Sequence, residues 1–522
     1  MVVGASLPSA ATGETVLRIG MTAADIPLTT GQADQGSEGL RFMGYTVYES
    51  LIQWDLSSAE NASILIPALA ESWEVDPEDN QRWIFKIREG AKFHDGSEFT
   101  AEDAIWNFEK ILNPDSPQYD PKQAAQGRGR VPTIESYAAL DPYTLEIRTT
   151  IPEAFLPYQI AWIVNSSPRR WEELGGDWDA FASNPSGTGP WMLDVFVPRE
   201  RAELVRNPDY WDESRVPQTD RVVLLPLPEA NSRVAALRSG QVDWIEAPPP
   251  DAVPSLEAAG FQIVTNVYPH NWQWHFSRVD GSPWNDVNVR KAANLALDRD
   301  SLYVLLGGLM QQAEGMVPTS SPWFGEPEFD VRYDPEEAKR LLAESGYGPD
   351  NPVQVNALIS ASGSGQMQPV PMNEFIQQSL GEVGIEVELI VVEWNTLLSI
   401  WRAGAKDAAS QGGHSVNVSY FSQDPFTALV RHLDSTLVNP NGTNWGWYQD
   451  DSMDAMFTKA RQTFDADEQN AVVAEIHERF VDEALFLFVA HDANPRALAP
   501  KVKNFVQAQN WYQDLTPVVI EE

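Results

Sequence analysis

Hydrophobic positions recur with two different periods along this chain, and each period predicts a different kind of element. Alternation of apolar and polar residues predicts half-buried strands at 15–20 (TVLRIG), 83–87 (WIFKI) and 144–148 (TLEIR). The near-continuous apolar run at 222–227 (VVLLPL) is typical of a strand buried on both faces. Strands are therefore predicted throughout the chain, mixed with helices.

A helical period marks the segments between these strands. Thr100 suits an N-cap, the acidic residues 102–103 complement the first turn, and Asn113-Pro114 ends the predicted helix. The segment 45–54 (YTVYESLIQW) is expected to form a helix that ends in a strand. Amphipathic helices are predicted at 289–297, 335–345 and 467–483, and further helices at 231–239 and 373–380.

The order of these elements predicts an α/β protein with more than one compact unit. A helix, a short turn and the strand 385–392 follow one another, as in the units of α/β lobes. A chain of 522 residues exceeds the usual size of one domain. Its character changes near residue 270, where we expect one lobe to end, and the stretch after about residue 490 is expected to return to the first lobe.

Charge and composition exclude several classes of partner. The chain has 36 Lys and Arg against 75 Asp and Glu, a net charge of −39, so it repels nucleic acid and anionic lipid. It has no cysteine, which excludes disulfides and cysteine-based metal sites. No apolar run of about 18 residues predicts a membrane span. The N-terminus does not read as a signal peptide, and we expect one to have been removed.

The common catalytic signatures are absent from the sequence. It has no GxSxG, GxxxxGK[ST] or HExxH motif. His270 and His275 are close in sequence, but in a strand their odd separation points them to opposite faces, so a metal site on them is the minor alternative. Carboxylate pairs are too common here to indicate a glycosidase. We predict a protein that is not an enzyme, with no catalytic residue, metal site or cofactor.

Several motifs follow one another from about Val16 to Phe505. Their succession resembles the signature of family 5 extracellular solute-binding proteins, the dipeptide-, oligopeptide- and nickel-binding components of bacterial ABC importers. The motifs are PALAESWEV (67–75), WIFKIREGAKFHDG (83–96), FTAEDA (99–104), DPYTLEI (141–147), NPSGTGPW (184–191), RNPDYW (206–211), ALRSGQVD (236–243) and NDVNVRKAANLALD (285–298). We interpret FHDG and GTGP as turns of the scaffold.

The resemblance implies the two-lobed periplasmic binding protein fold, type II and large, which is an α/β fold with an extra subdomain inserted in the first lobe. Residues 1–15 are then expected to be disordered or processed. Residues 16–268 would form the first lobe, with the subdomain at about 45–180. Residues 269–489 would form the second lobe, and 490–522 would return to the first.

The resemblance also implies a function in transport. The lobes would close around a small-molecule ligand by a hinge motion, and the closed form would dock on ABC transporter permease subunits. The protein would be a periplasmic or extracellular monomer. Two alternatives from other classes stay open, namely a secreted hydrolase that uses a carboxylate pair and a signalling receptor on the same scaffold.

One departure from the family pattern concerns the ligand. Peptide binders carry a WxADYxDP-like segment whose first acidic residue pairs with the peptide's α-ammonium group. The segment VSYFSQDP (418–425) resembles it and has Phe421 at that position, although Asp424 could serve instead. An aromatic ring cannot replace a carboxylate in a charge-assisted hydrogen bond. The ligand is therefore expected to be peptide-like or, given Phe421, a non-peptide such as a sugar, an amine or an aromatic or opine-like metabolite.

Aromatic residues in loops dominate the candidate ligand-binding residues, because tryptophan can stack on sugars, rings or cations. Ordinary core packing is the alternative role for each of them. Arg41 is the preferred partner for an anion, since its guanidinium offers a bidentate fork, with a surface salt bridge as the alternative. The full set is Arg41, Tyr45, Trp272, Trp274, Tyr420, Phe421, Asp424, Trp445 and Trp447.

Overall fold

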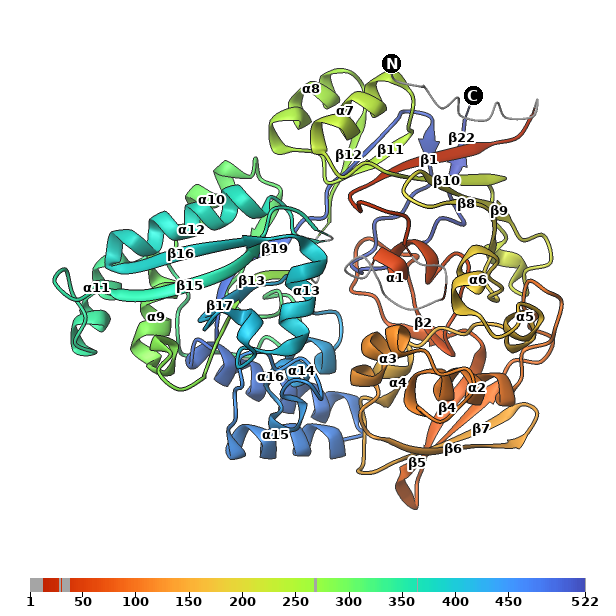
Figure 1. Ribbon diagram of the computed structural model, residues 1–522, viewed down its shortest axis with the longest axis horizontal. Coiled ribbons are helices and arrows are strands. Elements are labelled where there is room, and N and C mark those ends of the chain that lie inside the picture. The colour runs from red at the N-terminus through yellow and green to blue at the C-terminus, as the bar shows by residue number, and fades with distance from the viewer. Residues whose placement is uncertain (1–12, 28–29, 31–37, 267–269, 364, 522) are drawn as a thin grey trace.

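The computed structural model describes residues 13–27, 30, 38–266, 270–363 and 365–521, which form two α/β lobes and an inserted subdomain (Figure 1). The prediction of a two-lobed α/β fold is confirmed. Residues 1–12 of the expected N-terminal stretch lie outside the described residues. Glu14 and Thr15, which we assigned to that stretch, contact the first lobe through Arg221 and Asp220.

The first lobe is built on a seven-stranded sheet of order β12-β20-β11-β1-β10-β9-β8. Strand β20, from the C-terminal part of the chain, lies between β11 and β12 and pairs antiparallel with both. Helices α7 (Ala230–Ser239) and α8 (Val253–Ala258) belong to this lobe. The strands are β1 (Val16–Met21), β8 (Trp191–Val197), β9 (Arg201–Arg206), β10 (Arg221–Pro226), β11 (Trp244–Glu246), β12 (Gln262–Val264) and β20 (Arg496–Leu498).

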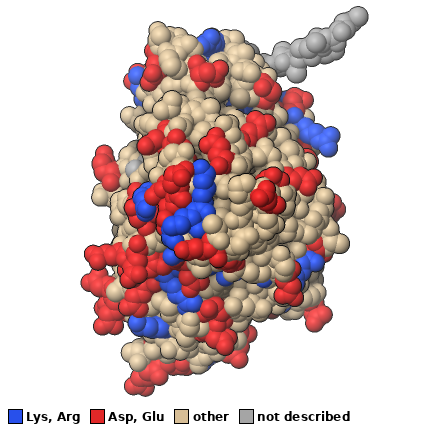
Figure 2. Space-filling view, turned by 90° about the vertical axis from the view of Figure 1, so that its left-hand side faces the viewer, with Lys and Arg blue, Asp and Glu red and all other residues tan. Residues whose placement is uncertain are grey.

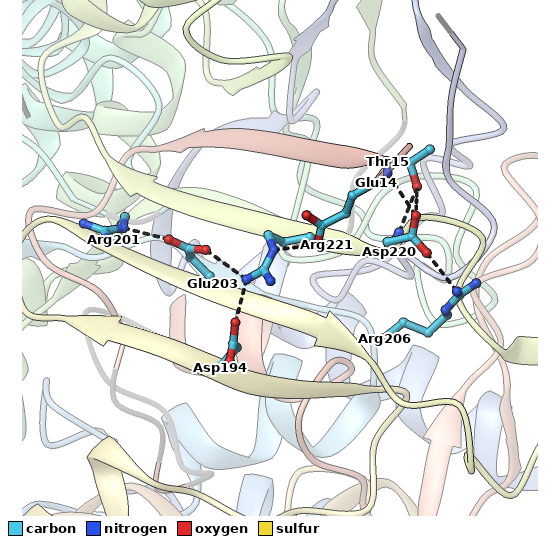
Figure 3. A network of polar contacts seen from close by, with 8 residues as sticks. All are labelled: Glu14, Thr15, Asp194, Arg201, Glu203, Arg206, Asp220 and Arg221. Carbon is cyan, nitrogen blue, oxygen red and sulfur yellow. Dashed lines mark hydrogen bonds and ion pairs between the residues drawn. The ribbon is translucent and has the colours of Figure 1, made fainter. Parts of the chain in front are cut away.

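Arginines and carboxylates alternate across strands β8, β9 and β10 (Figure 3). Arg221 contacts Glu14 at 2.9 Å, Asp194 at 2.7 Å and Glu203 at 2.9 Å. Glu203 is buried and also accepts a hydrogen bond from Arg201 at 2.8 Å. Each guanidinium in this group therefore has a carboxylate partner within the sheet.

The inserted subdomain has its own four-stranded antiparallel sheet of order β4-β5-β7-β6. Its helix α2 begins at the predicted cap, where the Thr100 backbone N–H and hydroxyl both donate to the Asp103 carboxylate. The elements are β4 (Ala70–Asp76), β5 (Asp79–Ile87), α2 (Ala101–Leu112), α3 (Pro121–Gly127), the 3-10 turn η1 (Arg128–Arg130), β6 (Ile134–Asp141), β7 (Thr144–Thr149) and α4 (Leu156–Ile160). Helices α5 (Pro168–Glu173) and α6 (Trp178–Ser183) lead back to the first lobe.

The second lobe is built on the sheet β14-β19-β13-β17-β15-β16, with β18 pairing to β13. Its strands are β13 (His270–Phe276), β14 (Met310–Gln312), β15 (Val353–Ser360), β16 (Ile385–Val392), β17 (Ser415–Asn417), β18 (Tyr420–Phe421) and β19 (Phe486–Asp492). Its helices are α9 (Val287–Ala296), α10 (Arg299–Leu305), α11 (Pro335–Glu344), α12 (Pro369–Val383), α13 (Trp394–Ala403), α14 (Arg431–Leu433), α15 (Asp451–Gln462) and α16 (Ala466–Asp482).

The prediction for residues 45–54 is wrong in its first half. The helix there is α1 (Glu38–Met43), and only β2 (Ile52–Trp54), which pairs with β3 (Leu65–Pro67), matches the expected strand. The carbonyls of Thr46 and Val47 instead accept hydrogen bonds from the backbone of Trp191 and Gly189. A Cβ on Gly189 would lie 2.1 Å from the Thr46 oxygen, so the GTGP segment needs glycine for this close approach.

The inserted subdomain packs directly against the second lobe. Trp162 stacks on Phe421 with ring centroids 4.5 Å apart, and Phe155 lies 6.4 Å from Phe426. The buried Arg461 of α15 bonds Glu153 across this contact. These contacts bring residues far apart in the sequence around one cavity.

Candidate functional site

A cavity of about 810 Å³ lies between the inserted subdomain and the second lobe. The subdomain contributes the end of α2, helix α3 and the turn η1. The second lobe contributes α13, β18 and residues 431–443. His270, at the start of β13, and Trp511, from the C-terminal segment, complete the wall. We call this space the subdomain cavity.

The subdomain cavity has a charge opposite to that of the chain. Arg128, Arg130, Arg402 and Arg431 line it, and no aspartate or glutamate is among its described lining residues. Outside it the chain is strongly acidic, with a net charge of −39, and acidic side chains are spread over the face of the molecule seen in Figure 2. The cavity is thus a local positive region in an acidic protein.

Arg130 is buried in an aromatic setting. Its guanidinium carbon lies 4.1 Å from the centre of the Trp162 ring and 5.2 Å from that of Phe421. Its Nη1 atom is buried and has no hydrogen-bond partner among the described residues. Burial, and next the nearby positive charge of Arg431, lower the pKa of Arg130 to about 10. Arg130 therefore remains charged at neutral pH without a paired carboxylate.

Arg431, at the start of α14, is equally buried on the opposite wall. One of its nitrogens, Nη1, donates to the Tyr420 hydroxyl, while Nε has no partner among the described residues. Its Nη2 lies 3.8 Å from where a Cβ of residue 129 would stand, so the two walls meet near the arginines. Trp394 and Trp401 in the same lining also have buried indole N–H groups without a described acceptor.

Of the predicted residues, Tyr420 and Phe421 line the subdomain cavity and Asp424 does not. The Asp424 carboxylate is fully buried and accepts from the Trp162 indole at 3.3 Å and the Thr427 backbone at 2.7 Å. Burial raises the pKa of Asp424. These contacts hold the segment after β18 in place.

The structure places Trp272 and Trp274 in the core of the second lobe, outside the lining of the subdomain cavity and of a smaller cavity between the first and second lobes. Both are fully buried in β13, and their indole N–H groups donate to the Gln366 carbonyl and the Asn373 side chain. The alternation of HNWQWHF correctly predicts that the two tryptophans share a face. That face packs into the core of the second lobe, and the opposite face of β13 is buried as well.

Tyr45, Trp445 and Trp447 are likewise absent from the lining of both cavities. Tyr45 is buried with its ring 4.4 Å from that of Tyr512. Trp445 is fully buried, and Trp447 lies under Lys406, whose Nζ is 3.6 Å from the ring centre. For these residues packing is the role that the contacts support.

Arg41 lines the smaller cavity, of about 460 Å³, between the first and second lobes. Its guanidinium forms a buried ion pair with Glu246 at 3.2 Å and lies 4.0 Å from the ring centre of Trp511. Asp492 lines the same cavity, and burial raises its pKa to about 6. Positive and negative groups are thus matched there, and Arg41 takes part in a buried ion pair, not the surface salt bridge considered as its alternative role.

The arginines of the subdomain cavity are not among the residues predicted from the sequence. Arg128 and Arg130 form a basic pair in GRGRVPT (127–133), a segment that contains no acidic residue of its own in a strongly acidic chain. This local pattern could have indicated a positive site. Arg431 carries no such signal, because only the packing of the subdomain on the second lobe brings it near Arg130.

Among the described residues, no group of three or more His, Cys, Asp or Glu side chains could hold a metal ion. No helix in that same part of the chain combines the length and apolar character that crossing a bilayer requires.

Known proteins resemble this chain over nearly its whole length. The model of the bacterial extracellular solute-binding proteins, family 5 Middle, matches residues 65–434. Di/tripeptide-binding protein 2 of Pseudomonas aeruginosa (strain UCBPP-PA14) is 27% identical over 489 residues, which are 89% of this chain and 89% of that protein. Two solved structures share the fold at lower identity.

The first is the ABC transporter-associated periplasmic binding protein DppA from Helicobacter pylori in complex with the peptide STSA. It has a TM-score of 0.84 at 23% identity, covering 97% of this chain and 98% of that one. The second is the binding protein AgaA in complex with agropinic acid, from A. tumefacien R10. It has a TM-score of 0.78 at 21% identity, covering 97% and 99% of the two chains.

Proposed function

Because this chain belongs to the family 5 bacterial extracellular solute-binding proteins, we propose that it captures one small solute in the subdomain cavity and delivers it to an ABC importer. The cavity carries this proposal. Its volume of about 810 Å³ falls in the range of small-molecule sites, and its walls come from two parts of the molecule that a hinge motion would separate.

Capture without chemistry agrees with the residues of the site. A glycosidase needs two carboxylates that flank the bond to be cleaved. No carboxylate is among the described lining residues of the subdomain cavity, and a hydrolase of that kind is therefore not favoured. We propose that the protein works outside the cytoplasm as a monomer and that its closed form docks on permease subunits.

Family membership leaves the ligand open. The names of the relatives above include di- and tripeptides and agropinic acid, so the family spans peptides and non-peptides. In our interpretation Phe421 stands where peptide binders place an acidic residue, which supports a ligand without a free α-ammonium group.

Gly129 offers a direct test of the site. A Cβ there would meet nothing closer than Arg431 Nη2 at 3.8 Å and Gly442 Cα at 4.0 Å, so a side chain fits the backbone and enters the space between the walls. Native mass spectrometry should detect one small molecule per wild-type chain and per Gly129→Ala chain. Gly129→Trp should fold with an unchanged circular dichroism spectrum and lose that molecule.

Two results would contradict the proposal. Retention of the molecule by Gly129→Trp would place the binding site elsewhere. Steady conversion of the released molecule by the wild-type protein, followed by chromatography, would make the protein an enzyme.

A further inference from the structure

We propose that the subdomain cavity selects an organic anion whose acidic group lies between Arg130 and Arg431 and whose apolar body lies against the aromatic wall. This inference rests on the proposed function, because it names the class of solute that the capture site takes. It concerns the two buried arginines, which lie on opposite walls of the cavity.

Arg130 and Arg431 have no counter-charge among the described residues. Arg130 is 6% exposed and Arg431 is 5% exposed, yet neither forms an ion pair with any described residue. A charge taken out of water is costly unless it is paired and hydrogen-bonded. The two positive charges also repel each other. The site without ligand therefore lacks a negative counter-charge, which a bound anion would supply.

The lining of the cavity also contains hydrogen-bond donors that lack an acceptor. Four of the buried polar atoms in this lining are donors without a described partner, namely Arg130 Nη1, Arg431 Nε and the indole N–H groups of Trp394 and Trp401. A carboxylate offers several acceptor sites and no donor, and it matches the planar fork of a guanidinium. A ligand rich in acceptors therefore fits this wall, whereas an ammonium group does not.

Asp424 does not fill the missing role. It acts electrostatically on Arg130, but its carboxylate oxygens are engaged by the Trp162 indole and the Thr427 backbone, and it is not part of the lining. It holds the indole of Trp162, which in turn stacks on Phe421.

The smaller cavity serves as an internal contrast. There Arg41 pairs with Glu246, and Arg496 contacts the same carboxylate at 3.5 Å, so charges of both signs are matched within the protein. Only in the subdomain cavity does the described lining combine buried arginines with no acidic residue. An anion is the ligand class that this difference indicates.

The aromatic side chains indicate the rest of the ligand. Trp394, Trp401, Tyr420, Phe421 and Trp511 line the same space, and such surfaces favour flat or apolar groups. We therefore choose naphthalene-2-carboxylate as the probe and the neutral naphthalene-2-carboxamide as its isosteric partner. The two differ in charge while their rings are the same.

The experiment is isothermal titration of the full chain after removal of any bound solute by unfolding and refolding. Wild-type protein should bind the acid at least about tenfold more tightly than the amide. In Arg130→Gln/Arg431→Gln this preference should fall below about twofold. The control Arg332→Gln removes an exposed arginine outside both cavities and should keep the full preference.

Three results would overturn the inference. They are equal binding of acid and amide by wild-type protein (no binding of either included), an acid preference that survives in the double variant, and a co-purified ligand that is neutral or cationic. If the double variant does not fold, Arg130→Gln alone must weaken acid binding at least about fivefold. A neutral ligand that Gly129→Trp displaces would leave the proposed function standing, whereas a ligand retained by Gly129→Trp would remove it.

Discussion

Arginines in the first-lobe sheet have carboxylate partners, whereas two arginines in the subdomain cavity have none among the described residues. In the sheet, Arg221 contacts three carboxylates and Arg201 contacts Glu203 (Figure 3). In the cavity, Arg130 and Arg431 are more deeply buried and have no described carboxylate partner. In the sheet the protein itself supplies carboxylates to its arginines, whereas in the cavity a bound ligand would have to supply the negative charge.

Buried arginines with only structural partners complete the comparison. Arg299 at the start of α10 is as buried as Arg130, and burial lowers its pKa to about 9. Its guanidinium donates to the carbonyls of Phe488, Asn294 and Leu297. The same Arg→Met substitution at Arg299, Arg221 and Arg130 therefore separates structural arginines from binding ones.

Arg299→Met should have the largest effect. It leaves several buried carbonyl groups without a donor, and we expect the free energy of unfolding to fall by about 3–5 kcal/mol. Urea denaturation followed by circular dichroism measures this. Arg332→Met, at an exposed position, is the matched control and should change the value by less than about 0.5 kcal/mol. If Arg299→Met lowered the free energy of unfolding no more than Arg332→Met, Arg299 would not be a structural arginine.

Arg221→Met should have an intermediate effect. Glu203 keeps its bond to Arg201, while the partly exposed Glu14 and Asp194 can be hydrated, so we expect a loss of about 1–2 kcal/mol. The same denaturation series measures it. Asp194→Asn, which removes only the most exposed partner, should cost about 0.5 kcal/mol or less. A larger loss from Asp194→Asn than from Arg221→Met would contradict this account of the sheet.

Arg130→Met should leave the ligand-free protein as stable as the wild type. The substitution loses the contact with Trp162 but relieves the burial of an unpaired charge and its repulsion by Arg431. We expect a change within about 1 kcal/mol in the same assay. A loss above about 2 kcal/mol would mean that Arg130 has a structural partner and would place it with Arg221.

Local patterns predicted most of the scaffold. The helix 231–239 and its end at Gly240, which adopts φ 75° as a left-handed cap, follow from the sequence alone. The strand 385–392 appears as β16 with the same bounds. These elements depend on residues that are neighbours in the chain, which is why periodicity and caps identify them. Residues 45–51 failed because a distant segment, 187–191, binds their backbone.

The site is harder to predict because its parts are distant in sequence. Arg130 lies in a short turn and Arg431 in a short helix, and neither belongs to a periodic pattern. The alternating tryptophans of β13 predict a shared face but not what that face contacts. A strand buried on both faces gives no indication of which face meets a ligand, and in β13 the tryptophan face meets the core.

The smallest expected effect concerns pH, and it distinguishes arginine from histidine as the source of positive charge. Burial and Arg431 lower the pKa of Arg130 only to about 10, so its charge, and the binding that depends on it, should be lost only as pH rises through that value. His270 also lines the cavity, but burial lowers its pKa well below the usual value, so it stays neutral from pH 6.5 to 9.

Affinity for naphthalene-2-carboxylate should therefore change less than about twofold between pH 6.5 and 9, measured by titration calorimetry at constant ionic strength. His270→Gln should show the same flat profile, since it removes a neutral ring and no charge. Binding that strengthens tenfold toward pH 6.5 in wild type and loses this slope in His270→Gln would assign the positive charge to the histidine. Arg130 and Arg431 would then not be the groups that bind the anion. Their lack of a carboxylate partner would therefore not explain ligand binding.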